Sequence, residues 1–479
     1  MATFNLIRNS RVFFTTNVNT TTGVVNASGF TTSNAQEIQV LDGFSFSQAT
    51  NADTVQISEA GDTPVRGQRS FNTSLNNVEI TFSTYMRPYK PAGTVTAEEA
   101  VLWNALLGDQ PMGTATTIGG TPTGATYVPA TGILTIAGTT MTFGSLAVGN
   151  IVTISGLGGA GASQANVPAK ILTLGAAAAT FQLLSATPNA LTLTAGVGVK
   201  LNQSAWTDNT AVAGDTAVGN VPYGQVTTAV SNKNQLQKFG MIIKVDGITY
   251  AIDNCAMDQA SIDFSLDGIA MIAWTAKGTA IRELAVTWTN LSADPTMANQ
   301  LVGTLKGKTT QANYITSKLS TVELKTQVGG GGPAFSLALT GGNVTIANNI
   351  SYVTPANLGT VNLPIGYFTG TRSVSGSINA YLRTGSANTA GLLSSMLANA
   401  ATSAETKYQL RVSIGGAANG VRVETLIVGA MLQIPTIDAQ AVMSTAISFT
   451  AQGTDFVLGA STEYDLENTN DLQVRYFST

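Results

Sequence analysis

The amino-acid sequence predicts a mainly β protein made of two tandem units, each a β-sandwich or barrel with one flanking α-helix, plus an inserted small β-sandwich or barrel domain. Three observations lead to this fold class. Most segments alternate apolar and polar residues at period two and are rich in Val, Ile and Thr, which is typical of strands. One block of sequence occurs twice, and the distance from an earlier repeated motif to this block differs between the two copies by the length of a small domain.

A block near the middle of the chain is repeated near its end. Residues 256–279 and 430–454 both begin with Ala-Met, contain an Ile-Asp pair that ends at Asp263 or Asp438, and finish with Thr-Ala-x-Gly-Thr. The spacing from the Asp to the final motif is identical in the two copies. A shorter match joins Gly67-Gln-Arg-Ser70 to Gly370-Thr-Arg-Ser373. Because repeated units present repeated interfaces, the duplication predicts a protein that assembles with copies of itself.

Each unit is expected to contain a β-hairpin that leads into the repeated block. Asp246-Gly247 separates two apolar-rich runs, and both residues tolerate the positive φ that a two-residue hairpin turn requires. Residues 415–420 take the same place in the second unit, between the runs 408–414 and 421–428. These signals predict a matching strand-turn-strand element in the two halves.

One helix is expected in each unit, ahead of this hairpin. The first begins at Thr96, with Glu99 three residues later as a capping box, and ends at Gly108. Its apolar stripe consists of Ala100, Leu102, Trp103, Leu106 and Leu107. The second is expected over 389–400, with an inward face of Leu392, Leu393, Met396 and Leu397. Glu98 and Glu99 fall in a helix first turn, where the helix dipole favours negative charge, so capping is favoured over a catalytic role.

The first unit carries an insertion. Arg69 and Asp263 are 194 residues apart, whereas Arg372 and Asp438 are 66 apart, so the first unit contains about 128 more residues. The excess has few charges and short Thr-, Val- and Leu-rich runs at regular spacing, the pattern of a small β-sandwich or barrel. These runs begin at Ile133, Met141, Ile151, Ile171, Phe181 and Leu191. The expected division is 1–110 and 231–300 for the first unit, 111–230 for the insertion and 301–479 for the second unit. We expect the insertion to point outward, because an outward position leaves the shared interfaces undisturbed.

Composition limits the functions that are open to the chain. Only 10% of its 479 residues are charged, 44% are hydrophobic, and the formal net charge is −4. Such a surface suits a protein largely covered by copies of itself, and a net negative charge argues against binding to nucleic-acid phosphates. The sequence has no His and one Cys, which removes the commonest general base, intramolecular disulfides and zinc sites built on Cys and His. Cys255 is expected to be a buried apolar residue on a strand.

No catalytic, cofactor-binding or metal-binding constellation emerges, and we expect that the protein is not an enzyme. Acid–base hydrolysis needs paired carboxylates in a suitable context, which the carboxylates of this chain do not offer. No apolar run approaches the length of a membrane-spanning helix, and the first residues lack the basic start and apolar core of a signal peptide. We therefore expect a soluble protein that is made inside a cell and does not insert into a membrane.

The repeated charged residues are the best candidates for contacts between subunits. Arg69 and Arg372 occur in the shorter repeat, and Asp263 and Asp438 occur in the longer one. An arginine can bind a carboxylate through two parallel hydrogen bonds, so these residues are expected to pair across a subunit contact. The alternative is that the arginines are solvated at a sheet edge, where charge prevents unwanted strand pairing. The sequence leaves both interpretations open.

Several short segments resemble one protein family. In the N-terminal part they are Arg8-Asn-Ser-Arg-Val-Phe13, Asn34-Ala-Gln-Glu-Ile38, Ser58-Glu-Ala-Gly61, Pro64-Val-Arg-Gly67, Arg69-Ser-Phe-Asn72 and Ser83-Thr-Tyr-Met-Arg-Pro-Tyr-Lys90. In the second half they are Thr340-Gly-Gly342, Asn348-Asn-Ile350, Tyr352-Val-Thr-Pro355, Pro364-Ile-Gly366 and Phe368-Thr-Gly370. Together they resemble the major tail tube protein of the T-five-like long-tailed bacteriophages. The resemblance covers most of 6–107 and 234–465 and leaves out the insertion.

The resemblance implies two tandem tail-tube folds in one chain, three of which would form a homotrimeric ring of pseudo-sixfold symmetry. Stacked rings would form the tail tube of the virion, a hollow conduit for DNA ejection that does not bind the DNA specifically. The implied partners are further copies of the chain, the tape-measure protein, which would first occupy the lumen, and the tail-terminator and tip proteins. Assembly would take place in the cytoplasm of the bacterial host.

Three other functions have to be weighed. The inner tube of a contractile tail shares the fold, but an outward insertion would obstruct the surrounding sheath, so a non-contractile tail is favoured. A surface adhesin or carbohydrate-binding β-protein would suit the uncharged polar strands of the insertion. The whole-chain repeat and the missing signal peptide count against it. A glycan hydrolase is opposed by the lack of paired catalytic groups.

Overall fold

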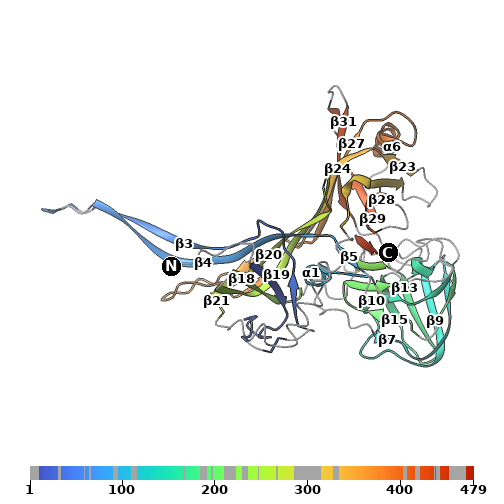
Figure 1. Ribbon diagram of the computed structural model, residues 1–479, viewed down its shortest axis with the longest axis horizontal. Coiled ribbons are helices and arrows are strands. Elements are labelled where there is room, and N and C mark those ends of the chain that lie inside the picture. Colours follow the sequence, from blue (N-terminus) through green and yellow to red (C-terminus); the bar gives the residue numbers. More distant parts are fainter. Residues whose placement is uncertain are drawn as a thin grey trace.

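The computed structural model describes residues 10–27, 29–30, 34–58, 60–63, 66–89, 95–108, 116–160, 162–165, 168–183, 191–195, 198–209, 223–228, 236–245, 248–265, 268–284, 314–326, 334–402, 407–415, 421–435, 437–438, 443–452 and 471–478. These residues lie mainly in β-strands, as the sequence predicts. Figure 1 shows a body from which one long hairpin projects, with a smaller β-domain beside it.

The first unit is a β-sandwich whose two layers share one long strand. One layer has the order β2–β1–β18–β19–β21 and the other has the order β3–β4–β20–β19, with antiparallel neighbours throughout. Asn254 has a φ of 48° between the two halves of β19, a conformation that asparagine tolerates better than most residues. The strands are β1 (Ser10–Thr15), β2 (Ala35–Ile38), β3 (Ser45–Ser58), β4 (Arg66–Tyr85), β18 (Phe239–Val245), β19 (Ile248–Ser265), β20 (Met271–Gly278) and β21 (Ala280–Glu283).

The second unit repeats this topology strand by strand. Its layers have the orders β23–β22–β28–β29–β32 and β24–β27–β31–β29, again antiparallel. Both units also place a helix between the fourth strand and the strand that precedes the shared one. The strands are β22 (Thr321–Thr326), β23 (Ala334–Leu337), β24 (Leu339–Ala347), β27 (Ser373–Tyr381), β28 (Lys407–Gly415), β29 (Arg422–Leu432), β31 (Ser444–Ala451) and β32 (Gln473–Phe477).

Strands predicted from hairpin signals are present, although the turns themselves lie outside the described residues. Val245 lies opposite Ile248, the register that a turn of two residues at 246–247 produces. Gly415 likewise lies opposite Arg422 in the second unit, on either side of 416–420. The short strand pairs are β5 (Pro88–Tyr89) with β6 (Thr96–Ala97) and β25 (Ser351–Val353) with β26 (Gly366–Phe368).

The inserted segment forms its own sheet and core, but its end returns to the main body. The sheet has the order β7–β15–β10–β12–β13–β9–β8, and its core is separate from that of the two units. Its elements are β7 (Thr116–Thr117), β8 (Gly119–Val128), β9 (Ile133–Thr142), β10 (Ile151–Ser155), β11 (Gly158–Ala160), α2 (Ala162–Ala165), β12 (Pro168–Thr173), β13 (Ala178–Leu183), β14 (Thr192–Thr194) and β15 (Lys200–Asn202). The strands expected at Ile133, Ile151, Ile171, Phe181 and Leu191 are therefore present, and Met141 lies in the continuation of β9.

Two further strands separate the end of the insertion from the boundary expected at residue 230. β16 (Trp206–Asn209) pairs with β17 (Tyr223–Thr227), and β17 pairs with β32 of the second unit. Val226 belongs to the main core. The independent sheet thus ends at Asn202, and the strands that follow extend a sheet of the body.

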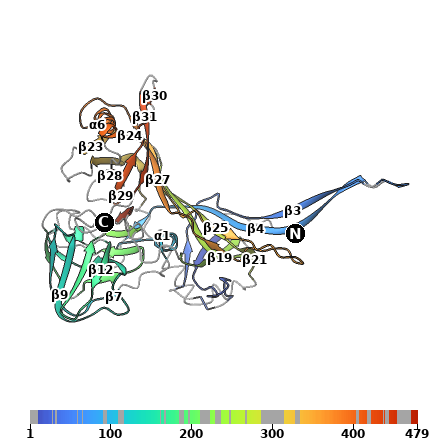
Figure 2. The same cartoon turned by 180° about the vertical axis from the view of Figure 1, so that it is seen from behind.

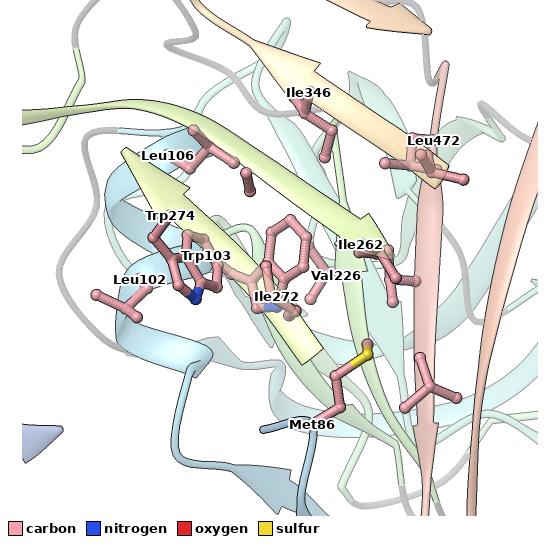
Figure 3. Close-up of a cluster of buried hydrophobic side chains, with 14 of the residues drawn as sticks. Met86, Leu102, Trp103, Leu106, Val226, Ile262, Ile272, Trp274, Ile346 and Leu472 are labelled. Carbon is pink, nitrogen blue, oxygen red and sulfur yellow. The ribbon is translucent and has the colours of Figure 1, made fainter. Parts of the chain in front are cut away.

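Helix α1 (Ala100–Leu107) begins four residues later than the sequence suggests. Thr96 lies in β6 rather than in the helix, and Glu99 occupies the N-cap position without a side-chain hydrogen bond. All eight helical residues are buried. Figure 3 shows Trp103 of α1 beside Trp274 of β20, and their rings meet edge to face with centroids 5.1 Å apart. The capping box was thus the wrong interpretation, because the helix start is set by burial against the sheet.

The second helix, α6 (Thr389–Thr402), covers the range expected for it. Leu392 and Met396 are buried and Leu393 packs partly against the core, as expected. Leu397 is instead exposed, so the inward face is narrower than the apolar pattern suggests. Cys255 is fully buried on β19, as expected. No helix among the described residues is long and apolar enough to cross a membrane.

Candidate assembly surfaces

The two units share one continuous antiparallel sheet. Its order is β3–β4–β20–β19–β24–β27–β31, and the step from β19 to β24 passes from the first unit to the second. This junction runs from Gln259 opposite Ala347 to Ser265 opposite Gly341. On it the hydroxyls of Ser261 and Thr345 lie 3.1 Å apart. The chain therefore already contains one complete contact between two units of this kind.

One face of this sheet packs on the core, and the other consists of small polar residues. Ile262, Trp274 and Ile346 point toward the core with neighbours from α1. The opposite face alternates with them, as strand geometry requires. One row across six strands contains Ser83, Ala273, Ser261, Thr345, Ser375 and Thr450. Parallel rows add Ser45, Ser47, Thr81, Thr275, Asn343, Ser377, Ala446 and Ser448.

Charges on this polar face largely cancel. The amino group of Lys277 forms an ion pair with Asp258 at 2.8 Å, and Glu79 lies opposite Lys277 on the neighbouring strand. Asp263 is exposed on the same face, where its carboxylate accepts a hydrogen bond of 3.2 Å from the Ser261 hydroxyl. The face is thus close to neutral with a slight excess of negative charge, and it lacks the clustered cations that hold phosphates.

The two outer edges of the continuous sheet correspond to the two sides of its internal junction. β3 takes the place of β24 in the first unit, and the stretch from Leu432 to Asp438 takes the place of the second half of β19. Among the described residues neither edge has a strand partner on its outer side. Ile434 occupies the position of Ile262, yet it is 52% exposed whereas Ile262 is 1% exposed. The second unit therefore exposes Ile434 at a position where the first unit buries Ile262 against β24.

A long hairpin, which we call the arm, extends the edge formed by β3 and β4. The last eight residues of β4 pair with β20, and the first twelve, 66–77, continue beyond it with β3 as their strand partner and one bridge at the base, from Ser74 to Asn362. At roughly 3.4 Å per residue they reach about 40 Å past the sheet, which Figure 1 shows as a ribbon standing clear of the body. Val55 and Phe71 are exposed on one face of the arm. An isolated two-stranded ribbon has no core of its own, so the arm needs a packing surface.

The structure does not bring the four candidate charged residues together. Arg69 is exposed on the arm, opposite Val55. Arg372 lies just before β27, half-buried, and its guanidinium is 3.4 Å from the carboxylate of Asp471 in the same chain. Asp438 pairs through its backbone with Ser444, and its side chain lies outside the described part of the chain.

The two arginines are also not equivalent in strand register. Phe82 on β4 lies opposite Trp274, and Gly376 on β27 lies opposite Phe449, the residue that the repeat aligns with Trp274. Arg69 precedes Phe82 by 13 positions, whereas Arg372 precedes Gly376 by 4. The match of the short Gly-x-Arg-Ser motifs is therefore not a structural correspondence, since the arm adds residues to the first unit only.

A buried carboxylate pair lies where the helix packs on the sheet. Glu98 binds Arg87 at 2.9 Å and accepts a hydrogen bond from the backbone of Gln39. Burial outweighs this support and raises the pKa of Glu98 to about 7. Glu99 is 1% exposed, and burial, together with the neighbouring Glu98 carboxylate, raises its pKa to about 7 as well. The pair was expected to cap the first turn of the helix, and instead it is buried, so that the raised pKa values make the stability of the fold depend on pH.

Sequence reasoning missed the polar face and the two sheet edges, although one signal for the face was present. Ser and Thr recur at every second position of several strands, as at Thr81 and Ser83 or at Ser375 and Ser377. The edges had no such signal, because the pairing partners of a strand are not written in its own sequence. Among the described residues, no three His, Cys, Asp or Glu side chains gather into a possible metal site.

Comparison with known proteins agrees with this geometry. No protein-family model matches the chain. The chain is similar to the tail tube protein pb6 of Escherichia phage T5, with 24% identity over 480 residues, which covers 98% of this chain and 78% of the relative. The similarity runs through both units, whose duplicated topology and shared sheet suit a protein that assembles with itself. This similarity over nearly the whole chain supports the identification of a T5-like major tail tube protein, a structural subunit of a bacteriophage tail.

Proposed function

We propose that three copies of the chain close into a ring of pseudo-sixfold symmetry, and that these rings stack into the tube of a non-contractile tail. The observation that carries this proposal is the junction between β19 and β24, which joins the two units of one chain. One outer edge of the sheet, β3, corresponds to β24, and the other, which follows β29, corresponds to the second half of β19. Joining chains through these edges would repeat the internal contact and complete a closed barrel, which removes exposed strand edges.

The internal junction also gives the register of the contact between chains. Ala260 lies opposite Ile346, and Ile262 lies opposite Val344. In the second unit, the strand pairings place Leu432 at the position of Ala260 and Ile434 at the position of Ile262. The corresponding residues on β3 are Phe46 and Phe44. Ile434 would then be covered by Phe44 of the next chain.

The same register places Gln433 opposite Ser45. These residues take the positions of Ser261 and Thr345, whose hydroxyls are in contact within the chain. The polar rows of the sheet would therefore continue from chain to chain around the ring. This continuity makes the neutral face the wall of the lumen.

A lumen of this kind allows DNA to pass without holding it. Association with DNA depends on cations that neutralise phosphates, and the described polar face offers Lys277, which is already paired with Asp258. Small hydroxyl side chains would interact weakly with the passing DNA and with the tape-measure protein that we expect to occupy the lumen before ejection. The tail-terminator and tip proteins would close the two ends of a tube assembled in the host cytoplasm.

The inserted domain fits a non-contractile tail better than an inner tube surrounded by a sheath. It lies beside the body, away from the arm, as Figures 1 and 2 show. A sheath would meet it on the outside of the tube. We therefore keep 1–110 with 231–300 and 301–479 as the two tube units, and 111–230 as the insertion, of which 116–202 forms the independent domain. Arg69, Asp263 and Asp438 remain candidates for subunit contacts.

The ring contact can be tested with cysteines at Ser45 and Gln433. The native Cys255 is fully buried, so it should not contribute to cross-links. The double variant Ser45→Cys/Gln433→Cys should form disulfides between chains on mild oxidation, and the largest covalent species should be a trimer. A variant that combines Ser45→Cys with Leu397→Cys, on the exposed side of α6, is the matched control. Ladders that continue to six chains would refute the trimeric ring, and assembled tubes without cross-links would refute the register.

A further inference from the structure

The loop between β25 and β26 exposes an unusual amount of apolar surface. Four of its large side chains are exposed, including Leu358 at 103% and Ile365 at 67%, and so is one at the end of each flanking strand. The full set, which we call the apolar loop, is Val353, Leu358, Val361, Leu363, Ile365 and Phe368. Together they expose on the order of 500 Å², which is as large as the biggest apolar patches of typical monomers and marks an interaction site.

The apolar loop is held in a fixed place rather than free to fold back. Tyr352 donates its hydroxyl to the backbone oxygens of Asn254 and Lys277 at 2.7 and 2.8 Å. Tyr367 donates to the carbonyl of Leu236 at 2.9 Å, and the two tyrosine rings pack together at 5.7 Å. Polar anchors at its base therefore leave the apolar side chains pointing away from the body.

The apolar loop lies at the end of the sheet from which the arm projects. Asn362 accepts a hydrogen bond from the backbone of Leu75 and donates one to Thr73 on β4. The loop also follows β24 and precedes β27, so it occupies in the second unit the place of the arm in the first. Figure 2 shows β25 close to the base of the arm.

A second apolar surface lies at the opposite end of the same sheet. Met271 begins β20 opposite Tyr85, and Tyr381 ends β27 opposite Ser444, so both mark the end away from the arm. Met443 lies at this end because its carbonyl accepts a hydrogen bond from the backbone of Leu382, and Tyr314 lies there because its ring packs against that of Tyr85. The exposed residues of this surface, which we call the blunt rim, are Ile269, Met271, Tyr314, Leu319, Tyr381 and Met443.

We propose that the apolar loop of one copy docks on the blunt rim of a second copy in the next ring. This inference rests on the proposed tube and names the surfaces that join its rings. Two different surfaces at opposite ends of one chain make a head-to-tail contact, which extends without closing. Three loops in a ring would offer about 1,500 Å² of apolar surface, in the range of a stable protein interface.

The two units then have different tasks in stacking. The first unit extends the arm, whereas the second unit presents the apolar loop, so arms and loops alternate around the rim of a ring. A ring rotated by one unit relative to its neighbour would place arms where loops should dock. The alternation therefore restricts the stacking to positions related by whole chains rather than by single units.

Introducing negative charge into the apolar loop tests the contact. In the double variant Leu358→Asp/Ile365→Asp, both changes fall on exposed side chains, so the fold should persist while the apolar contact is lost. We expect rings to form and the critical concentration for tube growth to rise at least tenfold, which corresponds to about 1.4 kcal/mol. The control is Val128→Asp/Val148→Asp, which alters two exposed apolar residues of the inserted domain and should leave tube growth unchanged.

Cross-linking gives an independent readout. Leu363→Cys combined with Met271→Cys, or with Met443→Cys, should yield covalent ladders longer than one ring when preassembled tubes are oxidised. Tubes of normal length from the aspartate variant, together with no ladder from either cysteine pair, would overturn the docking proposal while the ring proposal stands. A wild-type chain that never forms rings would instead overturn the proposed function itself.

Discussion

Replacing Glu99 with glutamine should remove the contribution of Glu99 to the loss of stability at higher pH and leave that of Glu98. The carboxyl is fully buried, and this burial raises its pKa from 4.5 to about 7. Because the folded state holds this proton more tightly than the unfolded state, the contribution to stability is complete below pH 4.5. It is lost as the pH rises through 7. At about 1.4 kcal/mol per pKa unit, the loss between about pH 5 and about pH 8 amounts to about 2.5 kcal/mol.

The assay is urea unfolding followed by tryptophan fluorescence, at a protein concentration below that needed for assembly. Trp103 lies on the helix that begins beside Glu99, so its emission reports on this region. The Glu99→Gln variant should gain about 2.5 kcal/mol over the wild type at pH 8 relative to their difference at pH 5. Glu283→Gln, at an exposed carboxylate, is the control and should not change the pH dependence. An unchanged pH dependence in Glu99→Gln would refute the reasoning, because it would mean that the buried carboxyl does not titrate in this range.

Two further predictions concern the insertion and the arginines. Residues Thr117 and Lys200 are paired neighbours on β7 and β15, so replacing 118–199 with a two-residue turn should leave tube formation by electron microscopy intact. Removing 118–228 should abolish it, because that deletion also takes β16 and β17 from the second unit. Equal behaviour of the two deletions would contradict the placement of those strands. Arg372→Ala should lower the free energy of unfolding by about 1 kcal/mol through loss of a half-buried ion pair. Arg69→Glu should instead leave the free energy of unfolding unchanged and weaken assembly. Normal assembly of Arg69→Glu would mean that Arg69 is solvated and makes no subunit contact.

Local patterns predicted most strands, because alternation and turn chemistry act over a few residues. The hairpin strands on either side of 246–247, the strands of the inserted domain and helix α6 all lie where the sequence suggests. The start of α1 was missed for a tertiary reason. Thr96 pairs in β6 with Tyr89, and this backbone pairing prevails over the capping signal that Thr96 and Glu99 provide.

The repeated motifs were reliable only where they lie within paired strands. The Thr-Ala pairs that open the final motif lie on β20 and β31, which occupy the same place in the two units. Asp263 and Asp438 are not equivalent, because they lie opposite Met271 and Ser444, three and five positions before the matching Trp274 and Phe449. The Gly-x-Arg-Ser match was misleading, because Arg69 belongs to the arm and Arg372 to the base of a shorter strand. Short motifs recur easily in a sequence rich in Gly, Ser and Thr, and only strand register distinguishes a shared position from a shared letter.

The sequence by itself predicted the mainly β class, the duplication, the insertion and the resemblance to phage tail tube proteins. These properties depend on local periodicity, on spacing and on similarity along the chain, all of which can be read without knowing contacts. Only the tertiary structure decided which face of the sheet is polar wall and which is core, where the sheet has free edges, and which ends carry apolar surface. Those properties arise when strands far apart in sequence become neighbours, as β19 and β24 do, and hydrogen-bond pairing between such strands leaves no local signal in either of them.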